Sequence, residues 1–439
     1  MWRPRSFLLA GLILILASLQ PTWGQAPVPV IFWHGMGGHL GTVVQALVTQ
    51  FNESQSAYRV EAIYKGSYDE VVTAAIAAYR AQDPPHLVQV YEVGTQTMLM
   101  SGAIYPVYQL MSDHGYQVDW ESFVAPVLSY YSKDGNLYSM PFNSSTPILY
   151  YNKDAFAQAG LDPEQPPATW DEVEAFSRQI MERDAASCGF TIQWPSWTMI
   201  ENMRAWHGLP IATQENGFAG LDVELLINDE FGRMHVGKLA EWAKSGIFQY
   251  GGRGGSSDPL FLNGQCAIFI ASSAAMGTIR QAASFNWATA MLPHWGEPYE
   301  KVNSIIGGAS LWVLKGARNP DAYAGVAAFL HFLTQPEQQA FWHKETGYIA
   351  ISNPANELLE REGHFEANPD QRTAWAQLTY SPPTPHTRGL RLGNFIQIRD
   401  VIEEELENIF AGTKTAEQGL DDAVARANRL LRDFADLYR

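Results

Sequence analysis

Two arginines near the C-terminus have the residue type and spacing to bind an anion. Arg391 and Arg399 lie eight positions apart in a stretch poor in acidic residues. A guanidinium group suits phosphate because its planar fork offers paired, charge-assisted hydrogen bonds. A lone arginine is more often a solvated surface charge, so other residues must complete any anion site.

Two tryptophans form a second candidate cluster. Trp194 and Trp197 enclose Pro195 and Ser196, which favour a loop. Core packing is the ordinary role of tryptophan, but two indole rings on one loop often line a ligand cleft. There they could stack on a glycerol or sugar face, or enclose a quaternary ammonium group. We therefore expect this pair to line a cleft.

The turn at residues 34–38, His-Gly-Met-Gly-Gly, resembles the oxyanion loop of α/β-hydrolases. That fold also requires a nucleophile elbow of the form G-x-S-x-G. The segments around Ser256 and Ser310 both lack its final glycine, so no catalytic residue is predicted. We expect the turn instead to free backbone N–H groups at a helix N-terminus that faces a cleft.

Metal and nucleotide sites have little support in the sequence. His34 and His39 lie five positions apart without a nearby carboxylate or cysteine, and the glycine-rich segment 251–255 lacks the Lys-Ser/Thr of a phosphate-binding loop. We predict no metal and no cofactor. Cys188 and Cys266 could pair in an oxidising compartment, but the sequence does not give the distance between them and leaves the disulfide open.

The elements that must position these residues alternate between strand and helix. Apolar runs at 28–33, 58–63 and 86–91 predict strands, and apolar residues at helical spacing between them predict connecting helices. This alternation predicts a parallel α/β sheet. Crossings between lobes are expected around 135–151 and after 266–270. The apolar faces predicted for the helices are Val43, Val44, Leu47, Val48 and Phe51; Val72, Ile76 and Tyr79; Val173, Phe176 and Ile180; and Leu420, Val424, Leu431 and Phe434. Capping boxes are predicted at Thr169 with Glu172 and at Thr415 with Gln418.

Composition and the N-terminus point to an exported protein. Arg3 and Arg5 precede an apolar run at 7–19 that is shorter than the ~20 residues of a membrane span, which predicts a signal peptide at 1–26, cut after Gly24 or Ala26. A chain of 439 residues with 46% hydrophobic residues can form two or three packed domains. Net charge is −17, and −19 without the two signal-peptide arginines, which disfavours nucleic acid as a partner.

Several motifs resemble those of bacterial extracellular solute-binding proteins of the maltose-binding type. They are Tyr-Tyr-Asn-Lys-Asp-Ala-Phe at 150–156, Ala-Gly-Leu-Asp at 159–162 and Thr-Trp-Asp-Glu at 169–172. Further segments resemble the glycerol-3-phosphate-binding periplasmic receptors of ABC importers, over essentially the whole mature chain. These segments lie at 32–34, 64–68, 89–95, 141–147, 305–312, 346–348 and 389–399.

The resemblance implies an α/β fold of two lobes around a hinged cleft, with several chain crossings between the lobes. We expect the N-terminal lobe to comprise residues 27–143 with 274–344, and the C-terminal lobe residues 144–273 with 345–439. In such folds, ligands lie between the lobes at strand carboxyl ends and helix N-termini.

The resemblance also implies a set of ligand-binding residues, to which the tryptophan pair is added. The expected ligand-binding residues are Tyr68, Glu92, Ser145, Trp194, Trp197, Ser272, Gly308, Tyr348 and Arg399. Arg399 would give its full charge to a phosphate, while the hydroxyl groups and the Gly308 N–H would add neutral donors. Glu92 and Tyr68 would bind glycerol hydroxyls.

The implied function is that of a periplasmic receptor without catalysis. It would capture sn-glycerol 3-phosphate, or a glycerophosphodiester such as glycerophosphocholine, and deliver it to ABC permease subunits at the inner membrane. The sequence does not rank the two ligands. Two alternatives remain open: a periplasmic phosphodiester hydrolase, suggested by the turn at His34, and a sugar receptor of the same fold.

Overall fold

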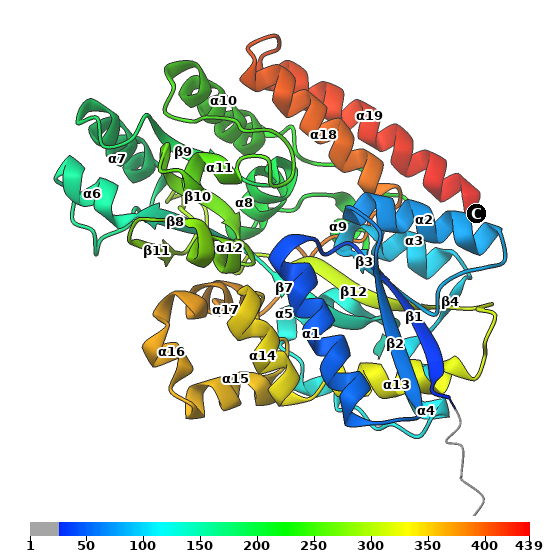
Figure 1. The fold of residues 1–439 in the computed structure, drawn as a ribbon. Helices are drawn as coiled ribbons and strands as arrows, with labels where there is room; N and C mark the ends of the chain where they lie inside the picture. The colour runs from blue at the N-terminus through cyan, green and yellow to red at the C-terminus, as the bar shows by residue number, and fades with distance from the viewer. Residues whose placement is uncertain (1–25) are drawn as a thin grey trace, which may run out of the picture.

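The computed structural model describes residues 26–439, so the predicted signal segment lies outside the described residues except for its last position. The chain forms two lobes, each built on its own β-sheet, with a pair of C-terminal helices lying across one side of both (Figure 1). Within the described part of the chain, no helix combines the length and apolar character needed to cross a membrane.

The first sheet has six strands in the order β2-β1-β3-β12-β4, with β7 also paired to β12. The strands are β1 (Val28–His34), β2 (Tyr58–Tyr64), β3 (Leu87–Tyr91), β4 (Ile104–Tyr105), β7 (Met140–Ser145) and β12 (Gly307–Leu314). The predicted parallel pairing is confirmed for β1 with β2 and β3. The late strand β12 instead runs antiparallel to β3, β4 and β7.

Helices cover both faces of this sheet. The helices that pack against its strands include α1 (Gly38–Ser54), α2 (Tyr68–Arg80) and α13 (Ala322–Leu333). The C-terminal helices α18 (Phe395–Phe410) and α19 (Ala416–Leu437) pack against each other and against α10 (Glu230–Ser245). All five apolar residues predicted to face the core from α1 are buried. The predicted face of α2 is confirmed for Val72, which is buried, but is wrong for Ile76 and Tyr79, which are 40% and 39% exposed. The helix turns Val71 and Ala75 inward together with Val72, since β3 packs against that side.

The second sheet has four strands in the order β11-β8-β10-β9. The strands are β8 (Pro147–Asn152), β9 (Cys188–Ile192), β10 (Cys266–Ser272) and β11 (Trp287–Ala290). Strand β11 pairs with β8, although it lies within the segment 274–344 that we expected in the first lobe. After α12 (Ala275–Ala282) the chain returns to the second sheet, so its way back to the first sheet begins after Ala290.

Shorter elements connect these layers. In the first half of the chain they are η1 (Glu92–Gly94), α3 (Thr95–Met100), α4 (Val107–Asp113), η2 (Trp120–Ser122), α5 (Ala125–Tyr131), β5 (Ser132–Lys133), β6 (Asn136–Leu137), α6 (Lys153–Ala159), α7 (Trp170–Glu182), the π-helix η3 (Ser196–Asn202), α8 (Met203–Trp206) and α9 (Thr213–Gly217). In the second half they are α10 (Glu230–Ser245), α11 (Asp258–Leu262), α14 (Pro336–Thr346), α15 (Asn353–Arg361), α16 (His364–Ala367), η4 (Pro369–Arg372) and α17 (Thr373–Leu378).

Both predicted capping boxes are confirmed. Thr169 accepts a hydrogen bond from the Glu172 N–H at 3.2 Å, and the Glu172 carboxylate accepts one from the Thr169 N–H. Thr415 and Gln418 form the same pair at the start of α19. The predicted core residues of α7 and α19 are buried except Phe176 and Val424, which are only partly buried.

Cys188 and Cys266 form a disulfide between neighbouring strands. They are directly opposed in the parallel register of β9 and β10, with a Cα–Cα distance of 4.6 Å. The bridge closes a loop with a sequence separation of 78 residues. Such a cross-link restricts the unfolded chain, which stabilises the folded state.

We predict that the double substitution Cys188→Ala with Cys266→Ala lowers the free energy of unfolding by about 2–4 kcal/mol. Urea unfolding of the oxidised parent, the reduced parent and the double variant measures this difference. The reduced parent should resemble the double variant. Equal midpoints for all three would show that the disulfide does not stabilise the fold.

Candidate functional site

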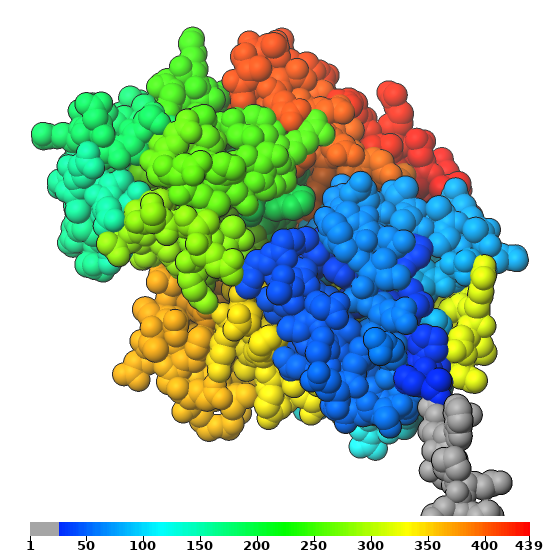
Figure 2. Space-filling view, in the orientation of Figure 1, coloured from blue at the N-terminus to red at the C-terminus, as the bar shows by residue number. Residues whose placement is uncertain are grey.

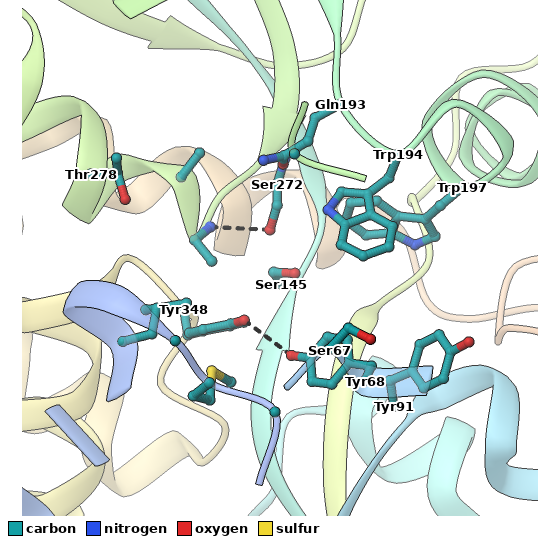
Figure 3. Close-up of a pocket in the computed structure, with 18 of the residues that line it drawn as sticks. Ser67, Tyr68, Tyr91, Ser145, Gln193, Trp194, Trp197, Ser272, Thr278 and Tyr348 are labelled. Atoms are coloured by element: carbon teal, nitrogen blue, oxygen red, sulfur yellow. Dashed lines mark hydrogen bonds between the residues drawn. The ribbon is translucent and has the colours of Figure 1, made fainter. Parts of the chain in front are cut away.

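A cleft between the lobes contains all nine residues expected at the ligand site. They line a cavity of about 300 Å³. In the space-filling view the surface is hollowed between the dark blue N-terminal segments and the green segments of the second lobe (Figure 2). Tyr68, Ser145, Trp194, Trp197, Ser272 and Tyr348 are seen around this cavity in Figure 3, which also shows that both lobes contribute.

Strand ends and helix starts deliver these residues to the cleft. Ser145 is the last residue of β7, and Ser272 is the last residue of β10. Tyr68 begins α2 directly after the capping residue Ser67, and Glu92 begins η1 directly after β3. The residues therefore meet at the edge where strands of the two sheets end, as expected for α/β folds.

The tyrosine side of the cleft is held by a chain of polar contacts. Tyr68 stacks on Tyr91 with ring centroids 5.2 Å apart, and its hydroxyl accepts a hydrogen bond from Asn143 Nδ2 at 2.9 Å. The Tyr68 and Tyr348 hydroxyl oxygens are 3.4 Å apart. Burial raises the pKa of the Tyr68 phenol well above its ordinary value, so the group stays neutral and can donate to a ligand.

Two consecutive glycines in β12 allow close packing at the cleft wall. Gly308 has a φ of +103°, and a Cβ there would lie 1.9 Å from the Asn143 carbonyl oxygen. A Cβ at Gly307 would lie 2.4 Å from the Trp197 ring. The indole therefore sits directly against the strand backbone, which only glycine permits.

Arg399 is not free to give its full charge to a ligand, which corrects the role expected for it. It lies 8% exposed on α18. Its Nε and Nη2 donate to the two carboxylate oxygens of Glu201, each at 2.7 Å, and Nη2 also lies 2.6 Å from Glu92 Oε1. Burial raises the pKa of Glu92. Two buried carboxylates thus share one guanidinium, and a bound phosphate must compete with them.

Glu201 is a central residue that the sequence reasoning missed. It is 1% exposed on the π-helix η3, and Ser196 Oγ donates to its Oε1 at 3.1 Å. π-helical turns are rare and often occur at functional sites. A signal was present in the sequence, because Glu201 is the single acid in the largely apolar stretch 197–206.

The tryptophan side of the cleft also holds a carboxylate. Trp194 has a left-handed φ of 51°, and its backbone N–H donates to the Gly254 carbonyl at 2.9 Å. Gln193 Nε2 donates to Asp258 Oδ1 at 2.9 Å, and both residues line the cavity beside the indoles. Burial raises the pKa of Asp258 to about 6. An acid next to two indole faces can hold a cationic group.

The turn at residues 34–38 lines the cleft through Gly35, Met36 and Gly37. Two of its N–H groups are already satisfied: Gly35 donates to Gln89 Oε1 at 2.9 Å, and Met36 donates to His34 Nδ1 at 3.3 Å. The expectation that the turn frees its N–H groups is therefore wrong for these two. Among the residues described, no group of three or more His, Cys, Asp and Glu side chains could hold a metal ion.

Arg391 does not accompany Arg399 into the cleft. Its Nη2 donates to the carbonyl oxygens of Tyr130 and Ser132 at 2.6 and 3.0 Å. The eight-residue spacing therefore does not make the two arginines one site. The short irregular stretch before α18 separates them, since only Arg399 lies on that helix.

Comparisons with known proteins agree with this architecture. A family model described as bacterial extracellular solute-binding protein matches residues 46–383. The sn-glycerol-3-phosphate-binding periplasmic protein UgpB of Escherichia coli K12 is 45% identical over 435 residues, 98% of each chain. Its counterpart in Salmonella typhimurium is 46% identical over 430 residues, 97% of each chain.

Solved structures share the fold at lower identity. UgpB of Mycobacterium tuberculosis in complex with glycerophosphocholine has a TM-score of 0.78 at 22% identity, covering 93% of this chain and 99% of that one. The sugar-binding protein MalE of Xanthomonas citri has a TM-score of 0.72 at 18% identity, covering 94% and 99%. By the family match and its two-lobed, maltose-binding-type fold, the chain belongs to the bacterial extracellular solute-binding proteins.

Proposed function

We propose that this protein captures a glycerophosphodiester, or sn-glycerol 3-phosphate, and delivers it to the permease subunits of an ABC importer at the inner membrane. The curated relatives are periplasmic binding proteins, and this chain is a periplasmic protein of the same family. The observation that carries the proposal is the cleft itself, where a buried arginine and two indole rings face one cavity. Its residues would bind and not transform the ligand.

The phosphate would lie near Arg399. One guanidinium nitrogen, Nη1, takes no part in the hydrogen bonds to Glu201, and serine hydroxyls from both lobes end at the same cavity. Tyr348 and the Gly308 N–H could add donors, while Glu92 and Tyr68 face the space for glycerol hydroxyls. Pairing of this kind is needed because an unpaired phosphate in a buried site is costly.

The charges of the cleft favour a zwitterionic ligand over a dianion. Glu92, Glu201 and Asp258 supply three carboxyl groups against the single guanidinium of Arg399. A glycerophosphodiester such as glycerophosphocholine carries one negative charge and one quaternary ammonium group. That ammonium fits between the Trp194 and Trp197 faces and Asp258. We therefore place glycerophosphocholine ahead of glycerol 3-phosphate.

Calorimetric titration of the mature chain with glycerophosphocholine, glycerol 3-phosphate and maltose tests the function. One-site binding of the phosphodiester, weaker binding of the monoester and none of maltose is expected. Binding of maltose alone would replace the proposal by a sugar receptor. Release of choline or glycerol during the titration would replace it by a hydrolase.

Substitutions around the guanidinium should separate the two ligands. Arg399→Lys keeps a charge but loses the fork, so both ligands should weaken by about tenfold or more. Glu201→Gln removes one negative charge, so it should shift the affinity ratio toward glycerol 3-phosphate, whose phosphate carries about −1.5 to −2 charges. The exposed Arg318→Gln is the charge control. Parental affinity in Arg399→Lys would contradict the phosphate position.

Removing one indole should affect only the cationic ligand. Trp194→Ala should weaken glycerophosphocholine by roughly tenfold, the value of about 1–2 kcal/mol for a desolvated cation–π contact. Glycerol 3-phosphate should change little. Tyr380→Ala removes a half-exposed aromatic ring outside the cleft and serves as control. Equal losses for both ligands in Trp194→Ala would argue that the indole only shapes the cavity.

Affinity for glycerophosphocholine should fall as the pH drops through about 6, the pKa of Asp258. The ammonium group stabilises the carboxylate form, so binding is strongest above this pKa and weakens as the acid is protonated. The ligand itself does not titrate in this range. Fluorescence titrations between pH 5 and pH 8, on the parent and Asp258→Asn, provide the measurement. If the affinity of Asp258→Asn fell with pH as steeply as that of the parent, the effect would belong to another group.

A further inference from the structure

A second pocket of about 440 Å³ lies outside the cleft and is unusually basic for this chain. Lys133, Arg388 and Arg391 line it, and Asp134 is the one acid among its lining residues. The full chain carries a net charge of −17, so a pocket lined by three cations differs in sign from the chain as a whole. None of these residues lines the ligand cleft.

Arg391 is the buried cation of this pocket. It is 7% exposed, and within residues 26–439 it forms no ion pair with a carboxylate. Its Nη2 donates to two backbone carbonyls, while its Nε is buried without a hydrogen-bond partner in the described chain. Burial lowers its pKa to about 10. Asp134 lines the same pocket and acts on Arg391 without forming an ion pair with it, so an anion in the pocket would supply a direct counter-charge to the buried guanidinium.

A second guanidinium is held close to the first by one aromatic ring. The guanidinium carbons of Arg388 and Arg391 lie 4.0 and 4.2 Å from the centroid of Phe218. The ring stabilises both cations through its π face. Arg388 also donates to Glu215 at 2.6 Å on the partly exposed side. Two like charges on one ring repel each other, and an anion in the pocket that both arginines line would reduce that repulsion.

The backbone that presents Phe218 is strained. Gln214, Glu215 and Asn216 all have left-handed φ values, of 54°, 52° and 57°. Each such residue costs roughly 1–2 kcal/mol, and strain of this kind gathers at functional sites.

The buried Asn216 side chain holds this turn in place. It accepts hydrogen bonds from the Ile211 and Ala212 N–H groups and donates to the His386 and Gly389 carbonyls. The strained turn is thereby clamped to the segment that carries both arginines.

We propose that this pocket is a second binding site, which takes a small oxyanion such as phosphate or the phosphate or carboxylate group of a small metabolite. Arg388 and Arg391 supply the guanidinium N–H groups that Glu215 and the two backbone carbonyls leave free, and Lys133 supplies a point charge. Phe218 and Met100 offer apolar surface to the rest of a larger ligand.

Calorimetric titration of the mature chain with inorganic phosphate tests this site. Lys133→Gln and Arg388→Gln should each weaken phosphate binding by about tenfold, since both lose a charged donor. Arg391→Lys should do the same, with its thermal midpoint measured to show that it folds. Arg318→Gln, an exposed arginine paired with Asp83, is the charge-matched control and should bind like the parent.

The cleft variant Arg399→Lys separates this inference from the proposed function. Phosphate binding that survives in Arg399→Lys but falls in the pocket variants supports the second site, whatever the cleft binds. Binding that falls only in Arg399→Lys places phosphate in the cleft and overturns the inference. Absence of saturable binding at millimolar phosphate, or an equal response of all variants including Arg318→Gln, also overturns it.

Discussion

The cleft depends on the buried contact of Arg399 with Glu92 and Glu201. Arg399 lies on α18. Glu92 lies on η1, which follows β3 of the first sheet, and Glu201 lies on η3, which follows β9 of the second sheet. Their contacts of 2.6 and 2.7 Å therefore hold both lobes and the C-terminal helix to one point. Removing one member of such a group leaves an unpaired buried charge, at a cost of about 3–5 kcal/mol. The network also fixes how much positive charge remains for a ligand.

The rest of the binding surface is arranged around this contact. Trp197 and Glu201 lie four residues apart on η3, so the element that positions a carboxylate for Arg399 also places an indole against β12. Gly307 makes room for that indole, and Gln193 connects Asp258 to the end of β10. The short segment from Gln193 to Glu201 thus supports both the arginine side and the indole side of the cleft.

Local patterns in the sequence predicted local structure well. The face of α1, the caps at Thr169 and Thr415 and the first three strands depend on residues within one or two turns or on one apolar run. The orientation of Ile76 and Tyr79 on α2 and the place of β11 depend on partners far along the chain, and they were not predicted correctly. Spacing and residue type pointed to Trp194, Trp197 and Arg399, whereas the other cleft residues came from the family resemblance. Glu201 and the burial of Arg391 could not be inferred, because each depends on what packs over it.

The disulfide lies at a place where protection from self-association matters. Strand β9 is the last strand of the second sheet, and all five of its residues are buried. In the described chain, its outer side is covered only by a short bridge, in which Phe190 pairs with the segment at residues 247–249. An edge strand of this kind is a template for pairing with another chain if it separates from its neighbour. The bond from Cys188 to Cys266 ties β9 covalently to β10, so this edge cannot peel away while the bridge is intact. In an oxidising compartment such as the periplasm, the bridge therefore keeps the last strand of this sheet in register with its neighbour.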